Sequence, residues 1–260
     1  MNDPLKILKD FTSFVPSSEW IVKESGLPWL ELDMMAPKDE MFKEIDSLRN
    51  DLILNCSNIS KQSPAYEARE EYKNKHNTSA ADHNWKFITL YGISSDIIED
   101  AFNYDNIKEV RYSWTEAGNK CPVHKEFIEK HFNLGNDFYI KYAVLEPGGY
   151  TLPHTDSGCF KVGDKDYNPG SELYALTFMI KNSPGNIFSF YQFGQLPITE
   201  GKGFLLNVDY FHCTHNTSNE NRYHMMIINT NRDKKSILDV FKDKSLIQSS
   251  WINSFKNFKN

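Results

Sequence analysis

The sequence predicts a mainly β protein, with a β-sandwich or barrel in its second half and flanking helices. Three observations support this fold class. Short segments rich in β-branched and aromatic residues recur between residues 138 and 229, turn residues separate them, and the segments on either side have helical spacing of apolar residues. We expect a single domain of 1–260, because no linker, internal repeat or low-complexity tract divides the chain.

The predicted strands are short and follow one another with little chain between them. Trp85 to Tyr91 is the first, because aromatic and β-branched residues recur along it at alternate positions. Six more runs make up the second half of the chain: Phe138 to Leu145, Tyr150 to His154, Glu172 to Ile180, Ile187 to Phe193, Gly203 to Val208 and Arg222 to Asn229. Turn residues such as Pro169-Gly170 and Pro184-Gly185 separate several of them, as is typical of sandwiches and barrels.

Helices are expected on both sides of this β segment. Met41, Ile45 and Leu48 follow one another at helical spacing, and the stretch from Pro122 to Gly135 has the start and stop signals of another helix. A helical pattern returns near the C-terminus, and we expect that tail to pack on the outside of the barrel. The expected domain thus has a mainly helical region, a β core and a helical tail, which are residues 1–135, 136–230 and 231–260.

Charge and composition limit the partners of the protein. Asp plus Glu number 35 and Lys plus Arg 29, a formal net charge of -6. We expect a small-molecule substrate and no nucleic acid, because a phosphate backbone needs a basic surface. No apolar run of about 18 residues would span a membrane, and no signal peptide is recognisable, so a cytoplasmic location is expected. The four cysteines form no Cys-x-x-Cys pair, and we expect reduced thiols.

The segment that ends in His154-Thr-Asp156 holds the first candidate site. Side chains two positions apart on a strand point to the same face, so His154 and Asp156 would present an imidazole and a carboxylate together. A histidine from another strand would complete a 2-His-1-carboxylate set, which leaves three open positions on a non-haem iron. The His-x-Asp triplet alone is weak, because a strand that ends in two polar surface residues would also contain it.

A second segment strengthens this interpretation. His212 and His215 compete for the third ligand position, and their offset of three puts them on opposite faces of a strand. Arg222 follows His212 by ten residues at the head of an apolar run, which favours His212 and places a fixed positive charge near the metal. A buried guanidinium needs a carboxylate partner. His224 is expected to be a hydrogen-bonded histidine of the sheet and not a ligand.

Together these motifs resemble a known family. Leu145-Glu-Pro-Gly-Gly-Tyr-Thr-Leu-Pro-His154-Thr-Asp156, then His-x-x-x-Asn from His212, then an arginine ten residues after that histidine, are similar to the double-stranded β-helix 2-oxoglutarate oxygenases. The aspartyl/asparaginyl β-hydroxylase-like branch is the nearest, and the resemblance covers residues 84 to 230. It implies a jelly-roll or cupin-like core, iron(II) on His154, Asp156 and His212, and the distal carboxylate of 2-oxoglutarate on Arg222.

One departure from the branch bears on the substrate. The branch carries an Arg-x-His pair on the strand after the first metal motif, where it contacts the substrate and the near end of 2-oxoglutarate. The corresponding run here, Leu173-Tyr-Ala-Leu-Thr177, has neither residue. Tyr174 and Thr177 are candidates for cofactor contacts in their place, although ordinary strand packing would also explain both. Asn216 is, by the resemblance, a structural residue beside the site.

The resemblance implies an iron(II)- and 2-oxoglutarate-dependent dioxygenase. With dioxygen it would hydroxylate a small molecule, an amino acid or amino-acid-like metabolite by analogy of fold, and release succinate and carbon dioxide. An intact Asp156 argues for hydroxylation or desaturation over halogenation. Alternatives are a cupin-type metal enzyme that does not use 2-oxoglutarate, a non-catalytic binding module on the same scaffold, and a zinc hydrolase. The first of these would have no use for Arg222.

Overall fold

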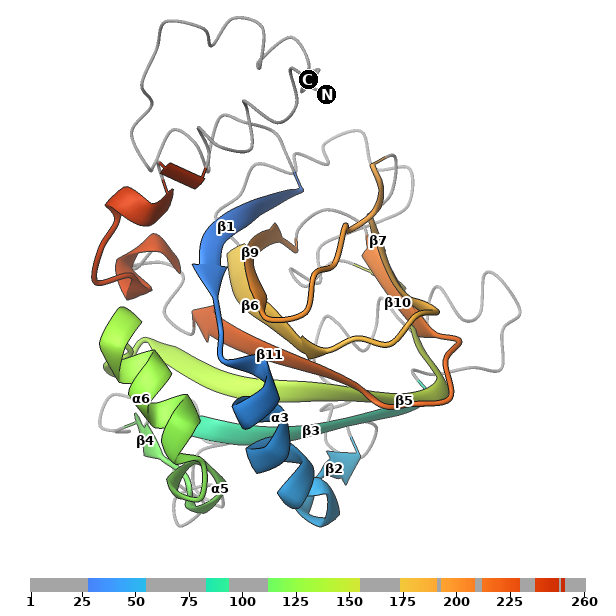
Figure 1. The fold of residues 1–260 in the computed structure, drawn as a ribbon, viewed down its shortest axis with the longest axis horizontal. Helices are drawn as coiled ribbons and strands as arrows, with labels where there is room; N and C mark the ends of the chain where they lie inside the picture. Colours follow the sequence, from blue (N-terminus) through green and yellow to red (C-terminus); the bar gives the residue numbers. More distant parts are fainter. Residues whose placement is uncertain are drawn as a thin grey trace, which may run out of the picture.

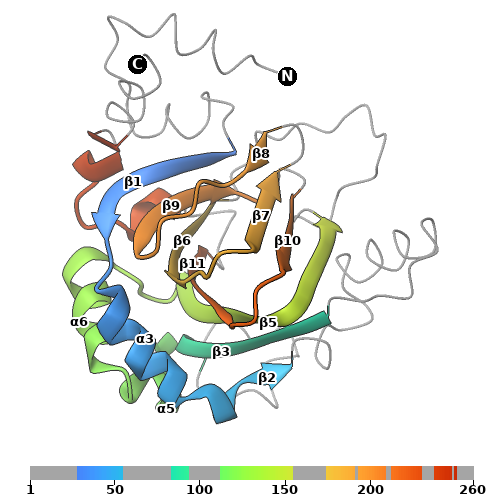
Figure 2. The same cartoon turned by 45° about the vertical axis from the view of Figure 1, so that its right-hand side comes forward.

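The centre of the molecule is an antiparallel sheet that curls into a barrel, seen from two directions in Figures 1 and 2. The computed structural model describes residues 28–54, 83–93, 112–154, 174–190, 193–208, 212–229, 237–247 and 249–250. In the order of pairing, the strands are β1 (Trp29–Met35), β9 (Lys202–Asn207), β6 (Tyr174–Lys181), β11 (Arg222–Asn229), β5 (Phe138–His154), β10 (His212–Asn216), β7 (Asn186–Phe190) and β8 (Gly194–Gln195).

Strand β5 belongs to both walls of the barrel. Its first part, from Phe138 to Leu145, pairs with β11, and its last part, which includes Thr151 and His154, pairs with β10. One wall therefore runs β1-β9-β6-β11-β5 and the other runs β5-β10-β7-β8. This interleaving of strands that are distant in sequence is the arrangement of a double-stranded β-helix. The predicted fold class is confirmed.

Three further strands extend the sheet beyond β5. β3 (His83–Ile93) lies along its free edge, and β2 (Ile53–Leu54) and β4 (Tyr112–Trp114) pair with β3. The sequence predicted only β3 among these, and it also missed β1. In β1 the residues at alternate positions are buried, so its alternation was the available signal. The described part of residues 1–135 thus contains four strands besides its helices, and the expectation that this region is mainly helical stays a prediction.

Two short helices cover the outer face of the first wall (Figure 1). They are α3 (Lys38–Ser47), which buries Met41 and Ile45, and α6 (Pro122–His131), which buries Phe127 and Ile128. A one-turn helix, α5 (Glu116–Asn119), precedes α6. Helix α6 ends at His131, earlier than predicted, because the backbone turns extended at Phe132 before it reaches Gly135.

The alternation of side chains along the strands produces two separate apolar cores. Outward-facing residues of β6 and β11, such as Phe178 and Met225, pack against the helices and the segment around the 3-10 helix η5 (Ile237–Val240). Inward-facing residues fill the barrel: Ala175, Met179, Phe188, Phe190, Leu196, Phe204, Leu206 and Val208. No helix within the described ranges is both long and apolar enough to cross a membrane.

A buried hydrogen-bond network fixes the two helices to each other and to β5. The Glu44 carboxylate of α3 accepts from the backbone N–H groups of Val123 and His124, at 2.8 and 3.2 Å, and lies 2.6 Å from His124 Nδ1. Burial lowers the pKa of His124 despite the opposing effect of Glu44. The ring is therefore neutral at pH 7: Nδ1–H donates to the carboxylate, and Nε2 accepts from the Tyr142 hydroxyl at 2.6 Å.

The network predicts a structural role for Glu44. We expect Glu44→Ala to lower the free energy of unfolding by about 2–4 kcal/mol, because three donors lose their acceptor in a buried place. Urea unfolding measures this change. Glu40→Ala, an exposed glutamate of the same helix, is the matched control and should change stability by less than about 0.5 kcal/mol. Equal effects of the two substitutions would contradict the structural role.

Candidate active site

The pairing of β5 with β10 brings His154 and His212 side by side. Their Cα atoms are register partners, and such partners lie about 4.5–5.5 Å apart across an antiparallel pair. Asp156 follows the end of β5 by two residues and lies outside the described residues, as does the side chain of His154. The structure thus places two of the three predicted ligand residues together by their backbones. The complete ligand set stays a prediction.

The His212 side chain lies inside the barrel. It is 5% exposed, and its ring stacks on Phe188 of β7 with the centroids 5.5 Å apart and the planes 8° from parallel. Phe190 contacts the same ring at 5.7 Å. His215 is exposed on the other face of β10, where its ring meets Tyr150 at 6.3 Å. The two histidines therefore face opposite sides, as their spacing predicts.

Arg222 is a buried cation that lacks an anionic partner among the described residues. It begins β11, pairs with Leu145 of β5 and is 2% exposed. Its Nη2 donates to the Thr214 hydroxyl at 3.2 Å, while Nε and Nη1 have no hydrogen-bond partner in the described part of the chain. Burial lowers the pKa of Arg222 from 12.5 to about 10, so the group is still charged at pH 7. A desolvated charge with two free donors is suited to binding a carboxylate.

Thr214 contacts the guanidinium and Thr151 contacts Thr214, and sequence reasoning missed both threonines. Thr214 lies two residues after His212 on β10, hence on the same inner face, and is 6% exposed. Its backbone N–H donates to the Thr151 hydroxyl of β5 at 3.1 Å. The available signal was the alternation along β10, which buries positions 212, 214 and 216. These contacts link the β5–β10 pair, which carries the two histidines, to the arginine of β11.

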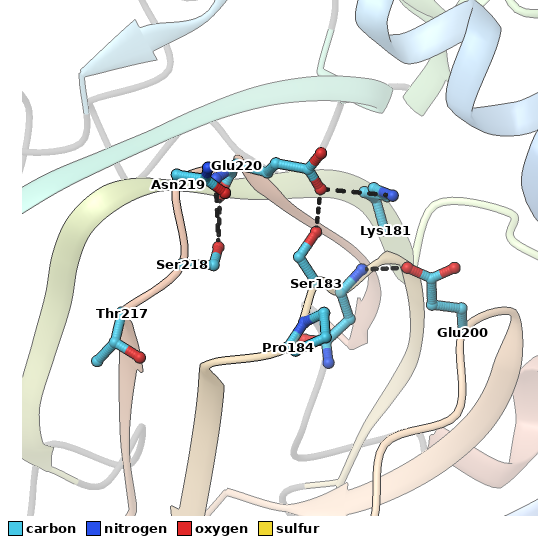
Figure 3. Close-up of a pocket in the computed structure, with 9 residues that line it drawn as sticks. Lys181, Ser183, Pro184, Glu200, Thr217, Ser218, Asn219 and Glu220 are labelled. Carbon is cyan, nitrogen blue, oxygen red and sulfur yellow. Dashed lines mark hydrogen bonds and ion pairs between the residues drawn. The ribbon is translucent and has the colours of Figure 1, made fainter.

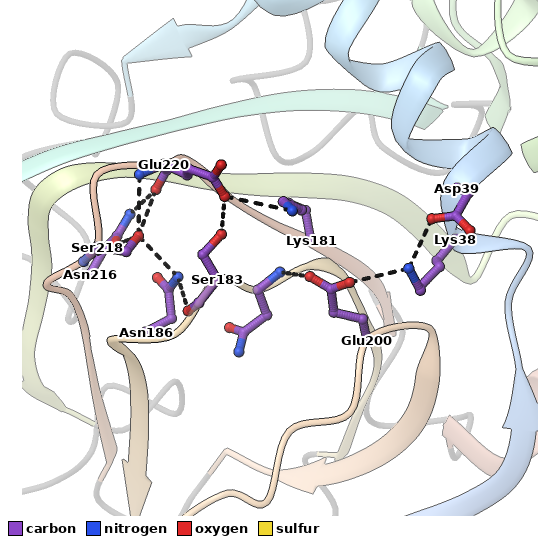
Figure 4. Close-up of polar contacts among 10 residues, drawn as sticks. Lys38, Asp39, Lys181, Ser183, Asn186, Glu200, Asn216, Ser218 and Glu220 are labelled. Carbon is purple, nitrogen blue, oxygen red and sulfur yellow. Dashed lines mark hydrogen bonds and ion pairs between the residues drawn. The ribbon is translucent and has the colours of Figure 1, made fainter.

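Asn216 is fully buried and makes hydrogen bonds with every polar atom of its amide. Its Nδ2 donates to the carbonyls of Leu145 and Glu220, both at 2.8 Å, and its Oδ1 accepts from the backbone and hydroxyl of Ser218. Figure 4 shows this cluster at the turn between β10 and β11. The amide therefore fixes the turn that leads into Arg222, which agrees with the structural role that the resemblance implies.

Of the two residues proposed to replace the missing Arg-x-His pair, only Thr177 has a described side chain. Thr177 is fully buried, and its hydroxyl hydrogen-bonds His224 Nε2. Tyr174 pairs with Asn207 through the backbone, and its side chain lies outside the described residues. The cofactor contacts predicted for Thr177 and Tyr174 stay predictions. His224, 4% exposed, has the hydrogen bond that was expected of it.

The sequence pattern of the aspartyl/asparaginyl beta-hydroxylase family matches residues 53–230, more than half of the chain. The chain belongs to this family. As a member of the aspartyl/asparaginyl beta-hydroxylase family, it is a 2-oxoglutarate-dependent oxygenase, and the predicted class of enzyme is confirmed. None of the curated proteins matches it.

Solved structures resemble this family member over most of its length. One is the viral collagen prolyl hydroxylase of Paramecium Bursaria Chlorella virus-1, with 13% identity, 78% of this chain and 96% of that chain covered, and a TM-score of 0.38. Another is a Trichoplax adhaerens prolyl hydroxylase in complex with a hypoxia-inducible-factor peptide, with 7% identity, 86% and 91% covered, and a TM-score of 0.45. A third is the epimerase SnoN, with 8% identity, 88% and 83% covered, and a TM-score of 0.38.

A polar surface pocket of about 820 Å³ lies at the other end of the barrel from His212, where three turns meet (Figure 3). Its charged groups are already paired. Glu220 lies 3.6 Å from Lys181 and accepts from the Ser183 hydroxyl. Glu200 lies 3.2 Å from Lys38 and accepts from the Asn182 backbone (Figure 4). The pocket therefore presents no unpaired charge of its own among the described residues.

Glu44, Cys121 and His124 form the one group of three potential metal ligands in the described part of this hydroxylase family member. The group lies on the outer face of the sheet, with the helices. Both ring nitrogens of His124 are occupied by Glu44 and Tyr142, and burial raises the pKa of the Cys121 thiol to about 12. A neutral thiol and an imidazole without a spare lone pair do not favour a metal. The trio is part of the structural network.

Because Arg222 is a buried charge, we expect its replacement to have opposite effects on the stability of the ligand-free protein and on the binding of 2-oxoglutarate. We expect ligand-free Arg222→Met protein to be at least as stable as wild type, because an unpaired buried charge is replaced by an apolar chain of similar length. With manganese(II) present, 2-oxoglutarate at about 100 times its Kd should stabilise wild type by roughly 2.7 kcal/mol and the variant not at all. Thermal unfolding with and without 2-oxoglutarate measures both effects. Arg49→Met, at an exposed arginine, is the control, and an equal ligand shift in Arg222→Met would contradict the assignment.

Proposed function

We propose that this protein is an iron(II)- and 2-oxoglutarate-dependent dioxygenase that hydroxylates a small molecule, an amino acid or an amino-acid-like metabolite. His154, Asp156 and His212 would hold the iron, and Arg222 would bind the distal carboxylate of 2-oxoglutarate. The observation that carries the proposal is the buried Arg222 guanidinium, which has two unpartnered nitrogens among the described residues. It is joined through Thr214 to the strand that carries His212.

The residues present fit the cofactor and co-substrate. Two histidines and a carboxylate leave open positions for a bidentate 2-oxo acid and dioxygen. When bound, iron(II) and 2-oxoglutarate supply the oxidising power: dioxygen and 2-oxoglutarate are converted to succinate and carbon dioxide, and one oxygen atom enters a C–H bond of the substrate. A cupin-type enzyme without 2-oxoglutarate would not account for a buried, positively charged anchor.

The chain's own side chains bind, orient and exclude water. Arg222 can donate two parallel hydrogen bonds to one carboxylate through Nε and a terminal nitrogen, and Thr214 limits the rotation of the guanidinium. On the other wall, Phe188 and Phe190 of β7 pack against the His212 ring, and Trp29 of β1 meets Phe190 from the first wall at 5.5 Å. These rings form an apolar wall beside the metal position, which favours exclusion of bulk water from the reacting groups.

The substrate class rests on the resemblance and on charge. The free amino acids are the first choice by analogy of fold, and a net charge of -6 does not favour a polyanion. A screen of succinate release across amino acids, with short peptides as a second panel, distinguishes the two kinds of substrate. Release with peptides alone would replace the small-molecule assignment without changing the proposed chemistry.

The predicted carboxylate ligand gives the most direct test of the metal site. Anaerobic addition of iron(II) and then 2-oxoglutarate to the full chain should produce a weak visible charge-transfer band. Asp156→Ala should lose the band and lower succinate release by at least about 100-fold, because one of three protein ligands is removed. His215→Ala, on the opposite face of β10, is the matched control and should keep both signals. Unchanged succinate release in Asp156→Ala would overturn the proposed metal site.

A further inference from the structure

Thr177 and His224 form a second polar pair in the barrel interior. They lie on the neighbouring strands β6 and β11, where His224 pairs in register with Met179 and Thr177 pairs with Met226. Thr177 is fully buried, His224 is 4% exposed, and the hydroxyl of the first bonds to Nε2 of the second. This hydrogen bond holds the imidazole in one orientation.

The pair lies between the two ends of the candidate site. His224 is two residues from Arg222 on β11, so both side chains point to the same inner face. Across the barrel, the Phe188 ring is edge-on to His224, with centroids 6.2 Å apart and planes at 88°, and stacks on His212 at 5.5 Å. A single aromatic ring thus contacts both imidazoles. His224 therefore shares a face of β11 with Arg222 and an aromatic neighbour, Phe188, with His212.

The spacing along β11 matches the length of the co-substrate. Two residues of a strand advance by about 6.6 Å. The carboxyl carbons of 2-oxoglutarate are joined by four carbon–carbon bonds of about 1.5 Å each, which span roughly 5 Å when extended. A molecule whose far carboxylate is bound to Arg222 would therefore bring its other end to the level of His224.

A polar pair is costly at this place unless it has a function. The side chains around it are apolar, among them Met179, Phe188 and Phe204, and an imidazole or hydroxyl loses the solvation of water when it is buried. A few oriented polar groups on an apolar wall are typical of ligand sites. On the inner face of β6 and β11, the described buried polar side chains are Thr177, His224 and Arg222, so the pair lies beside the proposed anchor of the co-substrate.

We propose that the Thr177–His224 pair positions the metal-end half of 2-oxoglutarate. The Thr177 hydroxyl fixes the ring of His224, and the imidazole makes a polar contact with the 2-oxo acid end, while Arg222 binds the distal carboxylate. This inference rests on the proposed function, because it requires 2-oxoglutarate in the barrel. It assigns Thr177 of β6 and His224 of β11 to a protein contact with the 2-oxo acid end of 2-oxoglutarate, which is separate from the metal ligands and from Arg222.

Calorimetric titration of 2-oxoglutarate into the full chain loaded with manganese(II) tests the inference without turnover. Thr177→Val removes the hydroxyl at constant volume and should raise the Kd about 10-fold, as should His224→Leu. Thr177→Ser keeps the hydroxyl and should stay within about 2-fold of wild type. Tyr142→Phe is the matched control, because it breaks a buried hydroxyl–imidazole hydrogen bond of 2.6 Å on the outer face of the sheet. It should lower thermal stability and leave the Kd unchanged.

The possible outcomes separate this inference from the proposed function. If Thr177→Val and His224→Leu behave like Tyr142→Phe, with lower stability and an unchanged Kd, the pair is structural and the inference is wrong. If Arg222→Met alone loses binding, the proposed function holds and only this inference fails. Absence of 2-oxoglutarate binding by wild type would overturn the proposed function itself. Circular dichroism of each variant confirms folding, and Thr177→Ser provides a rescue within the same position.

Discussion

A buried guanidinium at the base of the barrel is the constraint on which the functional account depends. Arg222 is desolvated, charged at neutral pH and bonded to Thr214 through one nitrogen, while two others have no partner among the described residues. A protein gains no stability from such a group. No carboxylate of the described residues pairs with it, and the proposed function assigns that place to the distal carboxylate of 2-oxoglutarate.

The topology explains how residues distant in sequence meet around this charge. β5 crosses from one wall to the other, so its first part supports β11 and Arg222 while its end supports β10 and His212. Alternation along β6, β10 and β11 then separates two environments. Outward side chains of β6 and β11 build the core beneath the helices, whereas His215 on the outer face of β10 is exposed, and inward side chains line the barrel. The helices can therefore stabilise the sheet without any contact with the reacting groups.

Much of this arrangement could be predicted from the sequence, because the decisive features are local. The ten-residue spacing from His212 to Arg222 covers one strand, one turn and the start of the next strand, and the opposite faces of His212 and His215 follow from alternation. Other features depend on tertiary contacts that local pattern does not contain. Strand β1 has a local signal in the alternation of its residues, but its place at the edge of the sheet depends on its pairing with β9. Likewise, the bond from Thr177 to His224 joins residues 47 positions apart. The runs Phe138 to Leu145 and Tyr150 to His154, which were predicted as two strands, form the single strand β5.

The structure of the full chain with manganese(II) and 2-oxoglutarate, determined without oxygen, would test the central claim most directly. The account predicts a metal bound by His154, Asp156 and His212, with the distal carboxylate of 2-oxoglutarate hydrogen-bonded to the Arg222 guanidinium, within about 3 Å of Nε or of Nη1. The account would be contradicted if a carboxylate of the protein formed the ion pair with Arg222, or if Asp156 lay apart from the metal.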